Sequence, residues 1–175
     1  MTRGVSIDAV PTCCGAAAVM NSQATKAVAL KAIAYVSRAA APVDSNELSA
    51  LEDEARRNNG VTGITGLLVF DAGHYVQVLE GPADAVDATL ARIREDPRHE
   101  DLELILDKPI SERSFARWAL ASIDLRAPAA SVDLEHLAED LEGFLARVDQ
   151  AQQGGRGLVL LSAFQQVLTL LDNAH

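Results

Sequence analysis

The sequence predicts an α+β fold, with a ferredoxin-like sheet of order β-α-β-β-α-β-β, two helices on one of its faces, and two further helices at the C-terminus. First, short apolar runs rich in β-branched residues alternate with stretches of helical periodicity. Second, the second and third apolar runs are separated by Asp71-Ala72-Gly73-His74, which has the composition of a hairpin turn. Third, the helical stretches on either side of this hairpin suggest two β-α-β crossovers. We expect the first and third strands to be adjacent and parallel at the centre of the sheet.

The strands are predicted from alternation and from β-branched composition. Large and small side chains alternate in Lys31–Ser37, the first strand. Because successive side chains of a strand point to opposite faces, Ile33, Tyr35 and Ser37 share one face. The other predicted strands are Gly66–Phe70, Tyr75–Glu80, Leu102–Ile110 and Trp118–Leu125.

The two helices within the sheet region are predicted from their ends and their apolar stripes. Asp44 and Glu47 have the spacing of a capping box, and Gly60 lies where a helix C-terminus favours a left-handed residue. Gly81-Pro82 opens the second helix, because proline suits a first helical turn. The stripes are Leu48, Leu51 and Ala55 in the first helix, and Val86, Leu90 and Ile93 in the second.

Charge and composition limit the partners and the location. The 175-residue chain has a formal net charge of -10, which argues against nucleic-acid binding and against an anionic membrane surface. Its two cysteines, Cys13 and Cys14, are neighbours and cannot form a loop-closing framework, which is typical of a reduced, cytoplasmic protein. No apolar run reaches the roughly 18 residues that a membrane span requires. We expect partners that are small molecules or proteins, and we predict no metal site.

Several polar side chains are predicted to face the core. Helical projection puts Asn59 on the inward face of the first helix, and strand alternation turns Gln77 toward the helices. Arg92 and Asp96, four residues apart, border the apolar stripe of the second helix. A buried amide without a hydrogen bond costs about 1 to 3 kcal/mol. Together with Tyr35, these residues therefore predict a cleft that holds a polar, planar ligand.

Each of these residues also has a purely structural interpretation. An asparagine before a glycine often caps a helix, a buried glutamine often bonds a backbone carbonyl, and most charged pairs at this spacing are surface salt bridges. These interpretations apply to Asn58 or Asn59, to Gln77, and to the pair Arg92 and Asp96, respectively.

Five stretches occur in order between Lys31 and Leu125. They are AYVSRA around Tyr35, ARRNNGVTGITGLL, VQVLEGP around Gln77, ARIREDPRH, and FARWALASIDL around Trp118. This ordered set resembles the BLUF domain, a blue-light sensor that binds a flavin between two helices of a ferredoxin-like fold. The resemblance implies a photoreceptor whose cofactor is FAD, with FMN or riboflavin as alternatives.

The resemblance also implies a role for individual residues. Tyr35 would be the photo-oxidised electron donor, and Gln77 would be the switch amide between the tyrosine hydroxyl and the flavin. Asn59 would hold the carbonyl and imide edge of the flavin ring. The expected flavin contacts are Tyr35, Ser37, Asn58, Asn59, Gln77, Arg92, Ile93 and Asp96, and the expected photoactive switch comprises Tyr35, Gln77, Trp118 and Leu120.

Leu120 departs from the family pattern, which usually has a methionine at this position near the glutamine. Leucine fills a similar volume but lacks the flexible thioether of methionine, which can accept a weak hydrogen bond. We expect flavin binding to be kept. We expect leucine at this position to affect instead how the change in the Gln77 amide is transmitted to the last strand, and how long the light-activated state lasts.

The chain is expected to comprise a leader over residues 1–30, the sensor over 31–126 and a two-helix extension over 127–175. The extension is too short for a cyclase or phosphodiesterase domain, so we expect no enzymatic activity and a signal passed on by protein contact. Its first helix has a short seam that packs on its own sheet or forms a coiled coil, whereas the second is apolar nearly all round, which predicts a homo-oligomer or partner interface. The seams are Leu134, Leu137, Leu141, Phe144 and Val148, and Leu161, Phe164, Leu168 and Leu171.

Two other functions fit the same fold. One is a ferredoxin-like regulatory or scaffold module that has lost its chromophore and acts only by protein interaction. The other is an enzyme of the acylphosphatase type, which is disfavoured because the sequence has no glycine-rich anion loop that presents an arginine. The colour of the purified protein distinguishes the photoreceptor from the scaffold.

Overall fold

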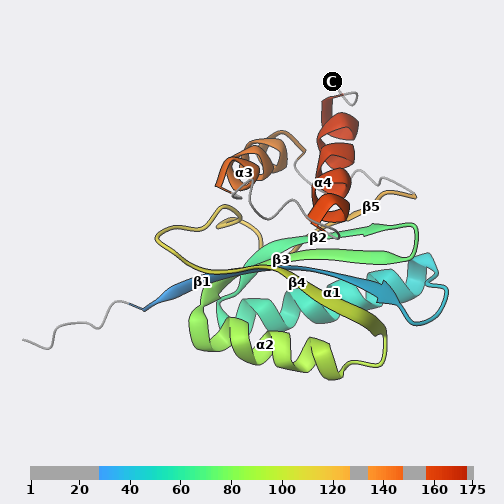
Figure 1. The fold of residues 1–175 in the computed structure, drawn as a ribbon, viewed down its shortest axis with the longest axis horizontal. Coiled ribbons are helices and arrows are strands. Elements are labelled where there is room, and N and C mark those ends of the chain that lie inside the picture. The colour runs from blue at the N-terminus through green and yellow to red at the C-terminus, as the bar shows by residue number, and fades with distance from the viewer. Residues whose placement is uncertain (1–27, 127–133, 148–156, 173–175) are drawn as a thin grey trace, which may run out of the picture.

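The structure is a computed structural model that describes residues 28–126, 134–147 and 157–172 (Figure 1). Its centre is a five-stranded sheet of order β4-β1-β3-β2-β5. The strands are β1 (Leu30–Ala39), β2 (Thr65–Asp71), β3 (His74–Pro82), β4 (His99–Ile110) and β5 (Ala121–Asp124). The helices are α1 (Ser45–Thr62), α2 (Ala83–Glu95), α3 (Leu134–Arg147) and α4 (Gly157–Asp172).

The predicted fold class is confirmed, but the predicted direction of the central strands is wrong. β1 and β3 are adjacent and antiparallel, with Leu30 opposite Pro82 and Arg38 opposite His74. The crossover through α1 brings β2 back in the direction of β1, and the hairpin then reverses the chain. β3 therefore enters between β1 and β2 and runs antiparallel to both of them.

The hairpin turn forms where the sequence predicts it. Asp71 pairs with His74, and the two residues between them, Ala72 and Gly73, have φ values of 45° and 80°. Positive φ at both central positions is the geometry of a type I′ turn, whose twist matches that of the flanking strands. The tight pairing of β2 and β3 also requires Gly66, because a Cβ there would lie 2.0 Å from the carbonyl oxygen of Val78.

The first helix begins as predicted and ends later than predicted. Asp44 and Glu47 form the expected capping box at its N-terminus. The left-handed C-cap is Gly63, with a φ of 69°, and not Gly60, which is still helical. The hydroxyl of Thr62 helps to extend the helix, because it donates to the carbonyl oxygen of Asn58 at 2.9 Å. Asn59 consequently lies inside the last turn, so its interpretation as a cap before Gly60 is wrong.

The last strand is shorter than predicted. β5 contains only Ala121–Asp124, because the preceding residues form turns that are anchored to β3. The buried carboxylate of Glu80 accepts the backbone N–H of Phe115 at 2.9 Å, and the N–H of Trp118 donates to the carbonyl oxygen of Phe115 at 3.0 Å. Burial raises the pKa of the Glu80 carboxyl. Trp118 therefore precedes the strand and does not follow its alternation of side chains.

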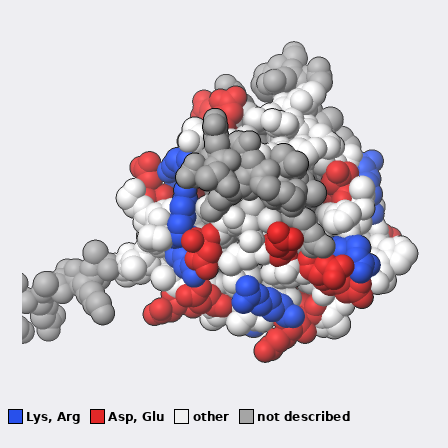
Figure 2. Space-filling view, viewed as in Figure 1, with Lys and Arg blue, Asp and Glu red and all other residues white. Residues whose placement is uncertain are grey.

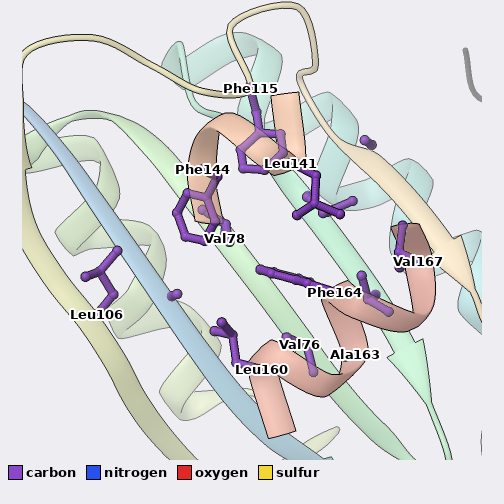
Figure 3. Close-up of a cluster of buried hydrophobic side chains, with 14 of the residues drawn as sticks. Val76, Val78, Leu106, Phe115, Leu141, Phe144, Leu160, Ala163, Phe164 and Val167 are labelled. Atoms are coloured by element: carbon purple, nitrogen blue, oxygen red, sulfur yellow. The ribbon is translucent and has the colours of Figure 1, made fainter. Parts of the chain in front are cut away.

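Two apolar layers cover the two faces of the sheet. α1 and α2 lie on one face, and α3 and α4 lie on the other (Figure 1). The layer beneath α3 and α4 is the larger cluster, in which Leu141 and Phe144 of α3 and Phe164 of α4 pack over Val76 and Val78 of β3 (Figure 3). The described part of the first C-terminal helix thus packs on its own sheet, as one of the two alternatives predicted.

Among the side chains that the structure describes, the buried face of α4 shares only Phe164 with the predicted seam. Its buried side chains are Leu160, Ala163, Phe164 and Val167. Leu161 and Leu168, which the sequence pattern assigned to the seam, are only half-buried. α4 contacts both α3 and the sheet, where it meets β1 and β2.

Some sequence predictions fall outside the described residues. These are residues 1–27 of the leader, which include the cysteine pair, and Val148 of the first C-terminal seam, together with the side chains of Leu134 and Leu171. Within the described ranges, none of the helices has the length and apolar character needed to cross a membrane. Figure 2 shows acidic and basic side chains intermixed on the face in view, where a nucleic-acid-binding surface would instead gather basic groups.

Candidate functional site

A pocket of about 150 Å³ lies between α1, α2 and the sheet. It forms where two apolar clusters of this face meet, one centred on Ile33 and Leu79 and the other on Leu48 and Phe70. The structure brings seven of the predicted flavin contacts to this pocket. They are Tyr35, Asn58, Asn59, Gln77, Arg92, Ile93 and Asp96. Their contacts with a flavin stay predictions.

Tyr35 and Gln77 are joined by a hydrogen bond in the wall of the pocket. They are direct partners across the β1–β3 ladder, so the register of the two strands brings them together. The Tyr35 hydroxyl donates to Oε1 of Gln77, and both residues are buried. Burial is also the main cause that raises the pKa of the Tyr35 phenol. The phenol is therefore neutral, and the amide NH₂ of Gln77 is left to donate to a ligand.

Asn59 reaches into the pocket from the last turn of α1. It is 3% exposed, whereas Asn58 is exposed at the pocket entrance. The Nδ2 atom of Asn59 donates to the carbonyl oxygen of Ala119 at 2.8 Å. This bond holds one end of the amide and leaves its side-chain oxygen as an acceptor. The inward direction of Asn59 predicted by helical projection is confirmed.

The charged residues at the end of α2 do not form the salt bridge that their spacing suggested. Arg92 donates to the hydroxyl of Thr89 at 3.0 Å, whereas Asp96 pairs with Arg98 at 2.5 Å. Arg98 also reaches Glu54 on α1, with a shortest nitrogen–oxygen distance of 3.2 Å. The Arg98 guanidinium holds the pKa of the Asp96 carboxyl below its usual value. An ion-pair network thus connects the two helices at the solvent side of the pocket.

Ser37 supports the pocket without lining it. Its hydroxyl lies 2.7 Å from Nδ1 of His99, a residue that does line the pocket. The His99 ring packs between Tyr75 and Tyr35, with ring centroids 4.6 Å and 6.2 Å away. Burial lowers the pKa of the imidazole, so His99 is neutral near pH 7. Ser37 is the one predicted flavin contact that does not line this pocket, and its contact with a ligand stays a prediction.

Trp118 and Leu120 do not line the pocket. Trp118 is half-buried against the cluster beneath α3 and α4, and its indole N–H donates to Oδ2 of Asp140 on α3 at 2.9 Å. Leu120 lies on the other side of the sheet from Trp118, on the face covered by α1, where it is buried beside Leu48 and Tyr75. The turn before β5 causes this separation, because two residues two positions apart share a face only within a regular strand. Their roles in a photoactive switch stay predictions.

Sequence reasoning missed half of the pocket lining. Glu54 and Ala55 lie about one turn before Asn58 and Asn59 on α1, so the helical period could have indicated them. The sequence carries no comparable signal for Arg98 and His99, because a turn after α2 brings them back over the pocket. The residues missed are Leu51, Glu54, Ala55, Leu68, Thr89, Arg98 and His99.

Comparison with known families gives this geometry a context. The sequence model of the family "Sensors of blue-light using FAD", or BLUF, matches residues 30–121. The chain belongs to this family. The matched range of the BLUF domain contains every residue of the pocket described above and ends before the two C-terminal helices.

Related proteins place the same domain in different settings. The β subunit of a photoactivated adenylate cyclase from Euglena longa is 42% identical over 94 residues, which are 53% of this chain and 11% of that protein. The dark-state structure of BlrB, a BLUF protein, superimposes with a TM-score of 0.57 and 26% identity, covering 81% of this chain and 96% of BlrB. Klebsiella pneumoniae BlrP1, solved with FMN and cyclic diGMP, gives a TM-score of 0.55 at 30% identity, covering 77% of this chain and 34% of BlrP1.

The extent of these matches limits what they imply. This chain spans about a tenth of the length of the photoactivated cyclase subunit, and the shared part is the BLUF domain. The BLUF domain is itself a sensor and not a catalyst, and it acts on partner or effector domains. The match to the photoactivated cyclase subunit therefore shows the BLUF domain and not cyclase activity.

Proposed function

We propose that this BLUF domain binds FAD in the pocket between α1 and α2, and that blue light switches the hydrogen bond between Tyr35 and Gln77. The observation that carries the proposal is this bond itself, which joins an oxidisable phenol to an amide in one buried wall. The change in Gln77 is then passed to other protein surfaces by contact.

The residues of the pocket fit an isoalloxazine ring. Asn59 and Gln77 supply amide donors and acceptors for the polar edge of a planar heterocycle. Leu51, Ala55 and Ile93 supply apolar surface for its faces. Arg92 adds a positive charge at the side of α2. Apolar walls with a few placed polar groups are the usual composition of a cofactor site.

The switch follows from the chemistry of these two side chains. When bound, a flavin supplies a ring that absorbs blue light and takes up an electron. Tyr35 can lose an electron while its phenolic proton moves along the existing hydrogen bond toward Oε1 of Gln77. If the Gln77 amide then rotates or tautomerises, the polarity of its hydrogen bonds reverses without movement of the ligand.

The family description favours FAD, whereas the related BlrP1 has been solved with FMN. We expect FAD in this chain. Releasing the cofactor from protein expressed with ample flavin, followed by chromatography against FAD, FMN and riboflavin standards, identifies it. Release of mostly FMN would contradict FAD as the bound flavin while leaving the photoreceptor function intact.

Gln77→Leu is expected to keep the flavin bound and to abolish the normal light-induced spectral shift. Leucine has nearly the same size but removes both the acceptor for Tyr35 and the donor left for the ligand. Absorption spectra in the dark and after blue light measure both effects. Gln165→Leu, an exposed glutamine on α4, is the matched control and should behave like the parent. A retained shift in Gln77→Leu would assign the switch to another amide.

We further propose that the domain passes its signal on by contact with other proteins. A cytoplasmic location, a homo-oligomer and an unidentified downstream protein partner all stay proposals. Light scattering of the full chain in the dark and in the light tests the homo-oligomer, and a monomer in both states would refute it. The rival, a scaffold that has lost its chromophore, predicts a colourless protein even when flavin is abundant during expression.

A further inference from the structure

Two neighbouring residues in the turn before β5 contact opposite sides of the sheet. The carbonyl oxygen of Ala119 accepts from Nδ2 of Asn59, which lines the pocket. The adjacent Trp118 donates its indole N–H to Asp140 on α3. The wall of the pocket and the C-terminal helices are therefore connected by two hydrogen bonds and one peptide unit.

The backbone around this connection is held tightly. The carbonyl oxygen of Trp118 accepts the N–H of Gly66 at 2.9 Å, and the N–H of Trp118 is bonded to Phe115. Leu120, the next residue along, is buried in the cluster beside α1. A shift of the Ala119 carbonyl is thus transmitted to its neighbours and not absorbed by a loose loop, because packed interiors respond by discrete rearrangement.

Asp140 is an unusual residue on its face of α3. It is half-buried and lies next to the buried stripe formed by Leu137, Leu141 and Phe144. A carboxylate beside apolar surface is costly unless it is hydrogen-bonded, and the indole N–H of Trp118 supplies such a bond at 2.9 Å. The main contribution of Asp140 is therefore the hydrogen bond that orients the Trp118 indole, and not apolar packing.

We propose that Asp140 is a positioning residue that holds the Trp118 indole on α3, and that this contact ties the C-terminal helices to the state of the pocket. The inference rests on the proposed function, since it names the route by which the light state leaves the flavin site. Trp118 lies within residues 30–121 and α3 lies outside them, so the contact joins the matched domain to the extension of this chain. When the hydrogen bonds of Asn59 change with its ligand, the Ala119–Trp118 segment shifts and α3 responds.

The test uses the full chain with its flavin and compares three variants. Asp140→Leu removes the acceptor, Asp140→Asn keeps an acceptor oxygen without the charge, and Glu139→Gln alters an exposed neighbour as the control. Trp118 is the one tryptophan of the sequence, so tryptophan fluorescence reports the surroundings of this indole alone. Hydrogen exchange of the α3 amides in the dark and in the light reports the response of the helix.

Asp140→Leu is expected to keep the flavin red shift, to change the Trp118 emission in the dark, and to lose the light-dependent change in α3 exchange. Asp140→Asn should retain part of that change, and Glu139→Gln should retain all of it. Unchanged Trp118 emission and full light-dependent exchange in both Asp140 variants would overturn the inference. A parent protein without any red shift would instead refute the proposed function, so the two failures are distinguishable.

Discussion

Tyr35→Phe is expected to leave the flavin bound in the dark and to abolish the normal light-induced red shift. The substitution removes only the hydroxyl, while the ring continues to fill its place in the buried cluster with Ile33 and Leu79. It removes both the oxidisable phenol and the proton donated to Gln77. Unpairing Oε1 of Gln77 costs about 1 to 3 kcal/mol of stability, which is too little to unfold an ordinary domain.

Tyr75→Phe is the matched control for this experiment. Tyr75 is the other tyrosine of the sequence and is also buried, but it packs against Phe70 and His99 and does not line the pocket. Absorption spectroscopy should therefore show a retained red shift in Tyr75→Phe and none in Tyr35→Phe. A normal photocycle in Tyr35→Phe would remove Tyr35 from the role of electron donor.

Phe164→Ala is expected to lower the free energy of unfolding by about 3 to 5 kcal/mol, the usual cost of truncating a buried phenylalanine. Phe164 is fully buried and meets Phe144 of α3 edge to face, with ring centroids 5.9 Å apart (Figure 3). Its loss leaves a cavity between α3, α4 and the sheet. Urea unfolding followed by circular dichroism measures the change.

Gln165→Ala on the exposed side of α4 is the control for this loss, and it should change stability by less than about 0.5 kcal/mol. A similarly small effect of Phe164→Ala would mean that α4 does not pack on the sheet in solution. The apolar residues of α4 would then be available for the oligomer interface that the sequence suggested. The two outcomes thus decide whether α4 belongs to the core or to an interface.

Local chemistry explains which parts of the fold were predictable from sequence. The capping box of Asp44 and the turn at Gly73 depend on residues within four positions of each other, and both form as predicted. The end of α1 was misjudged because Gly60 and Gly63 are both suitable caps. The choice between them depends on where β2 must begin, and this is set by pairing with β3.

The residues of the candidate site also divide into those that a local sequence pattern places and those that depend on distant contacts. Tyr35, Asn59 and Gln77 were placed correctly because strand alternation and helical period fix their faces. The positions of Arg98 and Trp118 depend on turns that are held by distant partners. Glu54 anchors Arg98 from α1, and Glu80 anchors the turn before Trp118 from β3. No local pattern reports such contacts, so sequence reasoning missed Arg98 and placed Trp118 inside the last strand, which begins only at Ala121.

The central claim is that this chain holds a flavin whose hydrogen bonds are switched by light through Tyr35 and Gln77. An absorption spectrum of the purified full chain, recorded in the dark and again after blue light, tests it most directly. We predict a yellow protein with a small red shift of the flavin bands that reverses in the dark. A colourless protein after expression with ample flavin, or a flavin spectrum unchanged by light, would contradict the account.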